Sequence, residues 1–236
     1  MPELDFGALA AAPYRDWLLA GFLFSLQLAG LALLAALPLA AAVALLRLAP
    51  RRAARAIGSG FVEGIRCVPL LVHLLFWYFG APELLPEALK TRLYQGGHNV
   101  EGGAAWIALT LYAAAYMAED MRSGLRAVPG GQLDAARALG FSYLAAMRLV
   151  LLPQALRIMV PPLISQTLNL WKNTSIATAI GTAELMYQAQ RVETGSFRGF
   201  ETFALATAAY LSVSLLITAL SLAFQHRYPP RPAARS

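Results

Sequence analysis

The sequence predicts an all-α membrane protein, and its composition and hydropathy are the observations that predict it. The chain has 236 residues, of which 58% are hydrophobic and 14% are charged, and its mean hydropathy is +0.54. A soluble domain averages roughly 45–50% apolar and about 25% charged residues. This excess of apolar residues does not fit into one globular core, so the chain belongs in a bilayer. The same figures exclude disordered and disulfide-rich chains, and the single Cys67 cannot form an internal bridge.

Five apolar segments are long enough to cross a bilayer, which requires a helix of about 20 residues. The predicted spans are residues 17–46, 57–79, 104–124, 157–182 and 201–225. The three middle spans each contain charged residues, which are costly inside a bilayer unless they are paired or wet. Five spans place the two ends of the chain on opposite sides of the membrane.

The distribution of basic residues predicts the orientation of these spans. With the N-terminus outside, twelve arginines fall in the inner segments and five lysines or arginines fall in the outer segments. Because inner segments carry the excess of Lys and Arg in membrane proteins, the sequence predicts an N-out, C-in topology. The basic residues are scattered and form no continuous basic face, so topology explains the net charge of +6 better than a nucleic-acid partner does.

The longest inner segment, residues 122–156, contains a helix–glycine–helix pattern. A run of good helix formers follows the breaker at residues 129–131, and Gly140 closes this short helix. A second short helix is predicted over residues 143–151 and is expected to stop at Pro153. On periodicity alone, such a pair either lies on the membrane surface or docks into a groove on a soluble partner.

The spacing within this segment resembles the EAA loop of bacterial ABC-importer permeases. The family pattern is Glu-Ala-Ala, three residues, Gly, nine residues and then Ile-x-Leu-Pro. This chain has Asp134-Ala135-Ala136, three residues, Gly140, nine residues and then Val150-Leu151-Leu152-Pro153. The Asp and Val departures keep the charge and the shape. Residues 61–80, 152–163 and 168–181 also resemble the polar-amino-acid branch of these permeases, so the resemblance covers about residues 20–225.

This resemblance implies the fold of a type I ABC-importer transmembrane domain. Residues 1–236 are then a single transmembrane domain of the bacterial cytoplasmic (inner) membrane, and residues 122–156 are its cytoplasmic coupling loop. The implied partners are two ABC ATPase subunits, a second permease subunit that is identical or homologous, and a periplasmic or extracellular amino-acid-binding protein. The residues implied to couple to the ATPase are Gly131, Asp134, Ala135, Ala136, Gly140, Leu152 and Pro153.

The chain is expected to be a transport subunit and not an enzyme. The ATP-binding pattern G-x-x-x-x-G-K-[ST] is absent from the sequence, and Lys172 follows no glycine loop. We therefore expect ATP and Mg on the partner ATPase, and neither a cofactor nor a metal in this chain.

Polar side chains inside the predicted spans mark a candidate substrate path, because an intramembrane ionisable group needs a partner or a wet cavity. Residues 63, 66, 73 and 77 have the spacing of one stripe on the second span. The candidate path residues are Glu63, Arg66, His73, Trp77, Tyr116, Glu119, Gln166, Asn169, Lys172, Asn173 and Ser175. Two ion pairs are the alternatives to substrate contact, Glu63 with Arg66 and Glu119 with Lys172. The polar face of the fourth span would alternatively bond to neighbouring helices.

The expected substrate is a polar amino acid, which presents both a carboxylate and an ammonium group. Glutamate or aspartate is favoured, because residues 76–87 most resemble glutamate/aspartate permeases and Lys172 suits an acidic side chain. Neutral amides and basic amino acids remain open. The alternative function is a self-contained small channel or secondary carrier with the same polar stripes as its pore. Secondary carriers usually contain inverted repeats, and the two halves of this sequence do not correspond.

Overall fold

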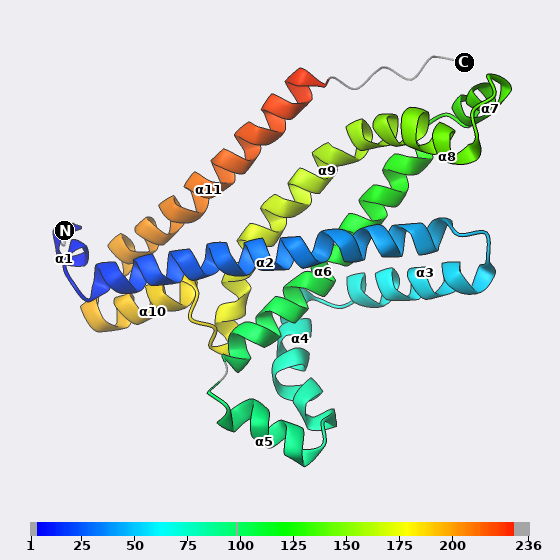
Figure 1. Cartoon of the computed structure of the whole chain (residues 1–236). Helices are drawn as coiled ribbons and strands as arrows, with labels where there is room; N and C mark the ends of the chain where they lie inside the picture. The colour runs from blue at the N-terminus through cyan, green and yellow to red at the C-terminus, as the bar shows by residue number, and fades with distance from the viewer. Residues whose placement is uncertain (1–3, 98, 229–236) are drawn as a thin grey trace.

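The computed structural model describes residues 4–97 and 99–228, and every regular element in these ranges is helical (Figure 1). The long helices are α2 (Tyr14–Leu48), α6 (Val100–Arg126), α9 (Leu152–Asn173) and α11 (Gly199–Arg227). The shorter helices are α1 (Gly7–Ala10), α3 (Arg52–Arg66), α4 (Leu70–Leu75), α5 (Glu87–Gln95), α7 (Gly131–Ala138), α8 (Tyr143–Ala146) and α10 (Leu185–Ser196). Wider π-helical turns are η1 (Phe76–Gly80) and η3 (Met147–Leu151), and tighter 3-10 turns are η2 (Ala81–Leu84) and η4 (Thr174–Ile180). The all-α prediction is confirmed.

Small side chains allow α2, α6 and α9 to pack closely. Ala32, Ala36 and Ala40 lie four residues apart on α2, so they form one stripe, and all three are fully buried against α6. On the other side of α6, Gly124 faces α9, where an added Cβ would lie 2.7 Å from the Cβ of Met159. Helices in a membrane associate through such close backbone approach, because lipid is as apolar as the side chains. These three helices form the frame of the molecule.

The second predicted span, residues 57–79, is not one straight helix. The segments Arg52–Arg66 and Leu70–Leu84 are both helical, but their axes differ by 100°. The bend has a local cause, because Pro69 lacks an amide hydrogen and disfavours helical backbone at the residue before it. Residues 63 and 66 therefore lie on one arm of the bend, and residues 73 and 77 lie on the other. The single stripe expected for these four residues does not exist.

The helix predicted to stop at Pro153 continues through it. The chain is helical from Tyr143 to Ile180 without a sharp bend, a stretch of 38 residues. The π-helical turn Met147–Leu151 precedes Pro153, which therefore lies in the first turn of α9. A proline is tolerated there because an amide hydrogen in a first turn has no intrahelical partner. The coupling segment is thus continuous with a long helix of the frame.

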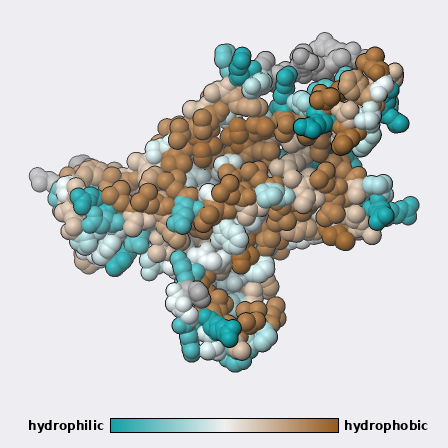
Figure 2. Space-filling model, in the orientation of Figure 1, coloured by the Kyte–Doolittle hydropathy of each residue, from teal (hydrophilic) through white to brown (hydrophobic). Residues whose placement is uncertain are grey.

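Among the residues that the structure describes, three helical stretches are long and apolar enough to cross a membrane, namely Tyr14–Leu48, Tyr143–Ile180 and Gly199–Arg227. The bent pair makes a fourth if it counts as one span. With 27 residues, α6 is also long enough to cross a membrane, but its sequence is less apolar than those of the three stretches. In Figure 1, α11 begins near the beginning of α2 and runs away from it toward the top of the view. Figure 2 shows a broad hydrophobic surface over the middle of the molecule, with hydrophilic residues gathered at its ends.

Candidate functional site

A pocket of about 300 Å³ lies between α6 and α9. Its lining residues are Leu109, Tyr112, Ala113, Tyr116, Gln166, Asn169, Leu170 and Asn173. Four of these were predicted path residues, one on α6 and three on α9. Three carboxamides and two phenols thus gather between helices that are otherwise mostly apolar. Such groups both donate and accept hydrogen bonds, so the pocket suits a polar and hydrogen-bonding ligand.

Hydrogen bonds between side chains organise the α9 wall of this pocket. The Nε2 of Gln166 donates to the Oδ2 of Asp120 on α6 at 3.0 Å, and the Nδ2 of Asn169 donates to the Oε1 of Gln166 at 3.4 Å. The carboxylate therefore fixes the orientation of the first amide, which in turn holds the second. Asp120 was not among the predicted path residues, although its charge inside a predicted span was a usable signal.

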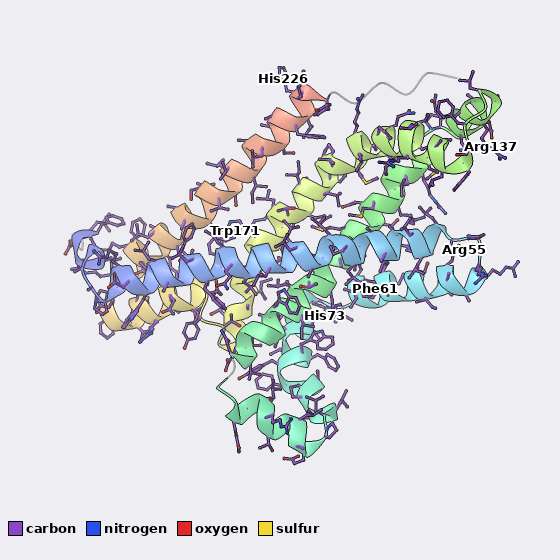
Figure 3. All side chains as sticks on the ribbon, in the orientation of Figure 1. Arg55, Phe61, His73, Arg137, Trp171 and His226 are labelled. Atoms are coloured by element: carbon purple, nitrogen blue, oxygen red, sulfur yellow. The ribbon has the colours of Figure 1, made fainter. Side chains whose placement is uncertain are left out.

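The α6 wall is held by aromatic contacts to both arms of the bent segment. The hydroxyl groups of Tyr112 and Tyr116 lie 3.3 Å apart. The Cζ of Arg66 lies 4.8 Å from the ring centroid of Tyr116, and the ring of His73 meets the ring of Tyr112 edge-on at 6.1 Å. Figure 3 labels His73 where α4 meets α6. The structure thus brings Arg66 and His73 to the pocket wall through the tyrosines, although the two residues share no helical stripe.

The other predicted path residues lie away from this pocket or contact carbonyl oxygens of the main chain. Glu63 is exposed on α3 and makes no ion pair with Arg66. Trp77 packs against the main core and meets Phe76 edge-on. The hydroxyl of Ser175 donates to the carbonyl oxygen of Lys172 at 2.8 Å, which closes the end of α9. His73 is buried, with its Nε2 3.0 Å from the carbonyl oxygen of Ile65.

The ion pair between Glu119 and Lys172, which was the alternative to substrate contact, is not formed. Glu119 pairs instead with Arg47 at the end of α2 and with Arg122 one turn further along α6. The reason is that α6 and α9 run antiparallel, as the contacts of Gly124 with Met159 and of Asp120 with Gln166 require. Glu119 lies near the last turns of α6, whereas Lys172 lies in the last turn of α9, far from it. Lys172 is exposed, and no ion pair of it occurs among residues 4–97 and 99–228.

The predicted helix–glycine–helix element is present in α7 and α8. Gly140 has a φ of +86°, which favours glycine. The amide of Phe141 donates to the carbonyl oxygen of Ala136 at 3.1 Å, and the amide of Gly140 donates to that of Arg137 at 3.0 Å. This is the Schellman arrangement that ends a helix. Ser142 then caps α8, because its side chain accepts a hydrogen bond from the amide of Ala145.

The surface of this element is apolar and open. Leu139 and Leu144 are 79% and 76% exposed, and Tyr143 and Phe141 are exposed beside them. Figure 3 labels Arg137 in the same element, at the end of the molecule where α6 ends and α9 begins. Exposed apolar side chains grouped in this way mark a surface that contacts either another protein or the membrane.

The seven predicted coupling residues occupy different positions within this element. Asp134 and Ala135 are exposed, whereas Ala136 is buried against the rest of the element. Gly131 begins α7, and Leu152 and Pro153 begin α9. A hydrogen bond of 3.3 Å from Gln154 to Gln132 ties the two helices together. The coupling element and the beginning of α9 are therefore in direct contact.

A buried carboxylate was missed by the sequence analysis. Glu184 is fully buried at the beginning of α10 and accepts hydrogen bonds from the amides of Met186 and Tyr187 at 2.9 and 2.8 Å. It also accepts from the hydroxyl groups of Tyr210 at 2.8 Å and Ser25 at 3.3 Å. It therefore joins α2, α10 and α11. An acidic residue just before a helical run is the signal that predicts such a cap. Within the described ranges, no cluster of three or more His, Cys, Asp or Glu residues could hold a metal.

Comparison with known proteins places this architecture in a family. Residues 18–232 match the family described as "Binding-protein-dependent transport system inner membrane component". The chain is 36% identical over 195 residues to the probable glutamine ABC transporter permease protein GlnM of Bacillus subtilis, covering 83% of this chain and 85% of the relative. It is 34% identical over 209 residues to the glutamate/aspartate import permease protein GltJ of Escherichia coli K12, covering 86% and 84%.

Solved structures show the same fold. A crystal structure of an amino acid ABC transporter with histidines matches with a TM-score of 0.81 and 31% identity, over 95% of this chain and 99% of that chain. An inward-facing structure of the MetNI methionine ABC transporter matches with a TM-score of 0.66 and 20% identity, over 91% and 99%. The second likeness is one of fold alone.

Proposed function

Because the chain belongs to the family of binding-protein-dependent transport system inner membrane components, and is a permease of a polar amino-acid ABC importer, we propose that its α6–α9 pocket lies on the translocation path. The observation that carries the proposal is the lining of the pocket. Gln166, Asn169 and Asn173 offer amide donors and acceptors, and Tyr112 and Tyr116 offer hydroxyl groups. An amino acid that leaves water loses hydrogen bonds to its carboxylate and its ammonium group. Donors and acceptors on the path have to replace them.

The substrate is proposed to be glutamate or aspartate. This assignment is supported by residues 76–87 and by the 34% identity to the Escherichia coli glutamate/aspartate permease. Glutamine is the second candidate, because the pocket lining is neutral and does not include Lys172. The Bacillus subtilis relative described as a probable glutamine permease supports the same candidate. A self-contained channel or secondary carrier is not favoured, since the family works with a binding protein.

The proposed topology has five spans, N-out and C-in, and counts α6 as the third. The modest hydropathy of α6 is consistent with its position, because a helix packed between α2 and α9 has little surface toward lipid. A second permease subunit, identical or homologous, would cover the exposed polar residues Asn169 and Lys172 of α9. Polar residues of that kind do not face hydrocarbon.

The proposed coupling site is α7 with α8, within residues 122–156. Two ATPase subunits, one for each permease, would receive the exposed apolar side chains of this element in a groove. The ATPases would bind ATP and Mg, and a binding protein would deliver the amino acid on the outer side. The contact between α7 and the beginning of α9 would then carry ATPase closure toward the pocket.

The test is ATP-driven uptake in proteoliposomes that contain the permease, its ATPase and its binding protein. We expect uptake of radiolabelled L-glutamate, L-aspartate or L-glutamine to fall at least tenfold in Asn169→Ala and Asn173→Ala, because each loses a charge-assisted hydrogen bond to the substrate. Thr207→Ala, on α11 and outside the pocket, is the matched control. Wild-type uptake in both pocket variants would contradict the assignment of the path.

A further inference from the structure

The connection between α2 and α3 gathers three arginines and no acid. We call Arg51, Arg52 and Arg55 the arginine turn, and residues 48–62 around it contain neither aspartate nor glutamate. None of the three arginines forms an ion pair with a residue that the structure describes. The arginine turn therefore carries positive charges that the described part of the chain does not neutralise.

Hydrogen bonds fix the shape of the arginine turn. Residues 49–51 are all that separates the end of α2 from the beginning of α3. The Nη1 of Arg55 donates to the carbonyl oxygens of Ala49 and Pro50, at 2.9 and 2.7 Å. These bonds use a single nitrogen of the guanidinium, and its other nitrogens bond to none of the described residues. The other two arginines of the turn are exposed, so the turn presents cationic N–H groups that are open to an anion.

Apolar side chains are exposed on both sides of the arginine turn. Leu45 and Leu46 are exposed in the last turn of α2, and Ile57 is 66% exposed on α3. Figure 2 shows hydrophilic residues at the end of the molecule where α2 and α3 join, directly beside a hydrophobic surface. Since α2 is one of the stretches apolar enough to cross a membrane, the arginine turn lies at the edge of a surface that suits hydrocarbon.

The arginine turn lies at the same end of the molecule as the coupling element formed by α7 and α8. Arg47, in the last turn of α2, pairs with Glu119 near the end of α6, and the chain leads from α6 into α7. Figure 3 labels Arg55 and Arg137 at this end. In the proposed N-out, C-in topology this end faces the cytoplasm, where the membrane surface carries anionic lipids.

An ATPase subunit is the competing occupant of this surface, because it also lies on the cytoplasmic side. Its proposed docking element is α7 with α8, a different part of the chain. The apolar side chains beside the arginine turn belong to α2 and α3, and α2 is a membrane-crossing stretch. A phospholipid presents an anionic head group to the arginines and hydrocarbon to these apolar side chains, so it fits both parts of the surface.

We propose that the arginine turn binds the phosphate group of an anionic phospholipid in the inner leaflet, and that the acyl chains of this lipid lie along Leu45, Leu46 and Ile57. Guanidinium groups match phosphate oxygens in a bidentate way, and the apolar stems of arginine side chains tolerate contact with hydrocarbon. The inference goes beyond the proposed function, because it concerns a lipid and not the pocket. The proposed topology is used only to name the leaflet.

The experiment compares two lipids that differ in the charge of the head group. The purified complex of permease and ATPase, in a neutral detergent, is titrated with dioctanoyl phosphatidylglycerol and with dioctanoyl phosphatidylcholine, and binding is followed by thermophoresis. We expect the anionic lipid to bind at least about tenfold more tightly than the zwitterionic lipid. Each arginine near an anionic head group contributes about fivefold, the equivalent of about 1 kcal/mol. Because the titration is done in detergent, its result does not depend on the orientation of the chain.

Variants of the two exposed arginines locate the site. Arg51→Gln with Arg52→Gln should weaken binding of the anionic lipid by roughly 25-fold and leave the zwitterionic lipid unaffected. Arg51→Lys with Arg52→Lys keeps both charges and should retain most of the preference, which separates loss of charge from a disturbed turn. The matched control is Lys90→Gln with Arg92→Gln, which removes two positive charges from α5, and it should bind both lipids like the wild type.

Glycerol 3-phosphate, which carries the phosphate without acyl chains, distinguishes a lipid from a free phosphate. We expect it to bind the wild-type complex at least about tenfold more weakly than the anionic lipid, because it lacks the contacts with hydrocarbon. Equal affinity for the two would overturn the assignment to a lipid. Equal affinity of the wild type for the two lipids, or an equal loss in the α5 control, would overturn the site. A glutamine double variant that keeps its lipid preference but loses the ATPase subunit during purification would show that the arginines bind the ATPase, which also overturns the proposal.

Discussion

Replacement of Gly140 tests whether the bend between α7 and α8 transmits the work of the ATPase. An added Cβ at this position meets no atom within 4 Å, so a small side chain causes no clash within the chain. The remaining effect comes from the backbone, because a residue with a Cβ adopts the φ of +86° at a conformational cost of about 1–2 kcal/mol. That cost lowers the population of the bent conformation by roughly 5- to 30-fold. Gly140→Ala should therefore uncouple transport in part.

A larger effect is expected for Gly140→Asp, which adds a charge beside the exposed apolar side chains of the docking surface. We expect insertion and assembly to persist, while uptake and the stimulation of ATPase activity by the loaded binding protein are lost. Both are measured in proteoliposomes. Gly130→Ala is the matched control, since Gly130 also has open space around it but has a helical φ of −56°. Wild-type transport in Gly140→Asp, or equal losses at the two glycines, would refute the reasoning.

Three further substitutions probe the frame and the charges. Glu119→Gln breaks the ion pairs with Arg47 and Arg122, so the melting temperature of the purified complex should fall. An unchanged melting temperature would refute the stabilising role of these ion pairs. Gly124→Ala forces α6 and α9 apart at Met159 and should cost about 1–3 kcal/mol in chemical unfolding. Lys172→Met should leave the melting temperature unchanged, because Lys172 is exposed and does not pair with Glu119. A lower melting temperature that the second change Glu119→Gln restores would contradict the structure.

The parts of the fold that the sequence predicts are those set by local chemistry. Long apolar runs predicted α2 and α11, and the helix formers before Gly140 predicted α7 and its end. Local chemistry also explains two errors. Pro69 has a stronger effect than the apolarity of its neighbours and bends the second segment by 100°, whereas Pro153 has a weaker effect than expected because it lies in a first helical turn.

The partners of charged side chains could not be predicted in the same way. The polar residues Gln166, Asn169 and Asn173 of α9 could be grouped from the sequence because helical spacing alone puts them on one face, and all three line the pocket. The partner of Glu119 depends instead on which helix ends meet in space. Similarly, Glu184 is bonded by Ser25 across 159 positions of the chain, and no local pattern specifies that contact. Tertiary packing decides such pairs.

The central claim is that a polar amino acid occupies the pocket between α6 and α9, and protection of a single thiol tests it most directly. Cys67 is exposed and is first replaced by serine. Asn169→Cys then places a thiol in the pocket, and Lys90→Cys places one on α5, outside it. In the complex of permease and ATPase, L-glutamate or L-glutamine should slow the reaction of a charged thiol reagent at position 169 and leave the rate at position 90 unchanged. Equal rates at position 169 with and without either amino acid would contradict the account.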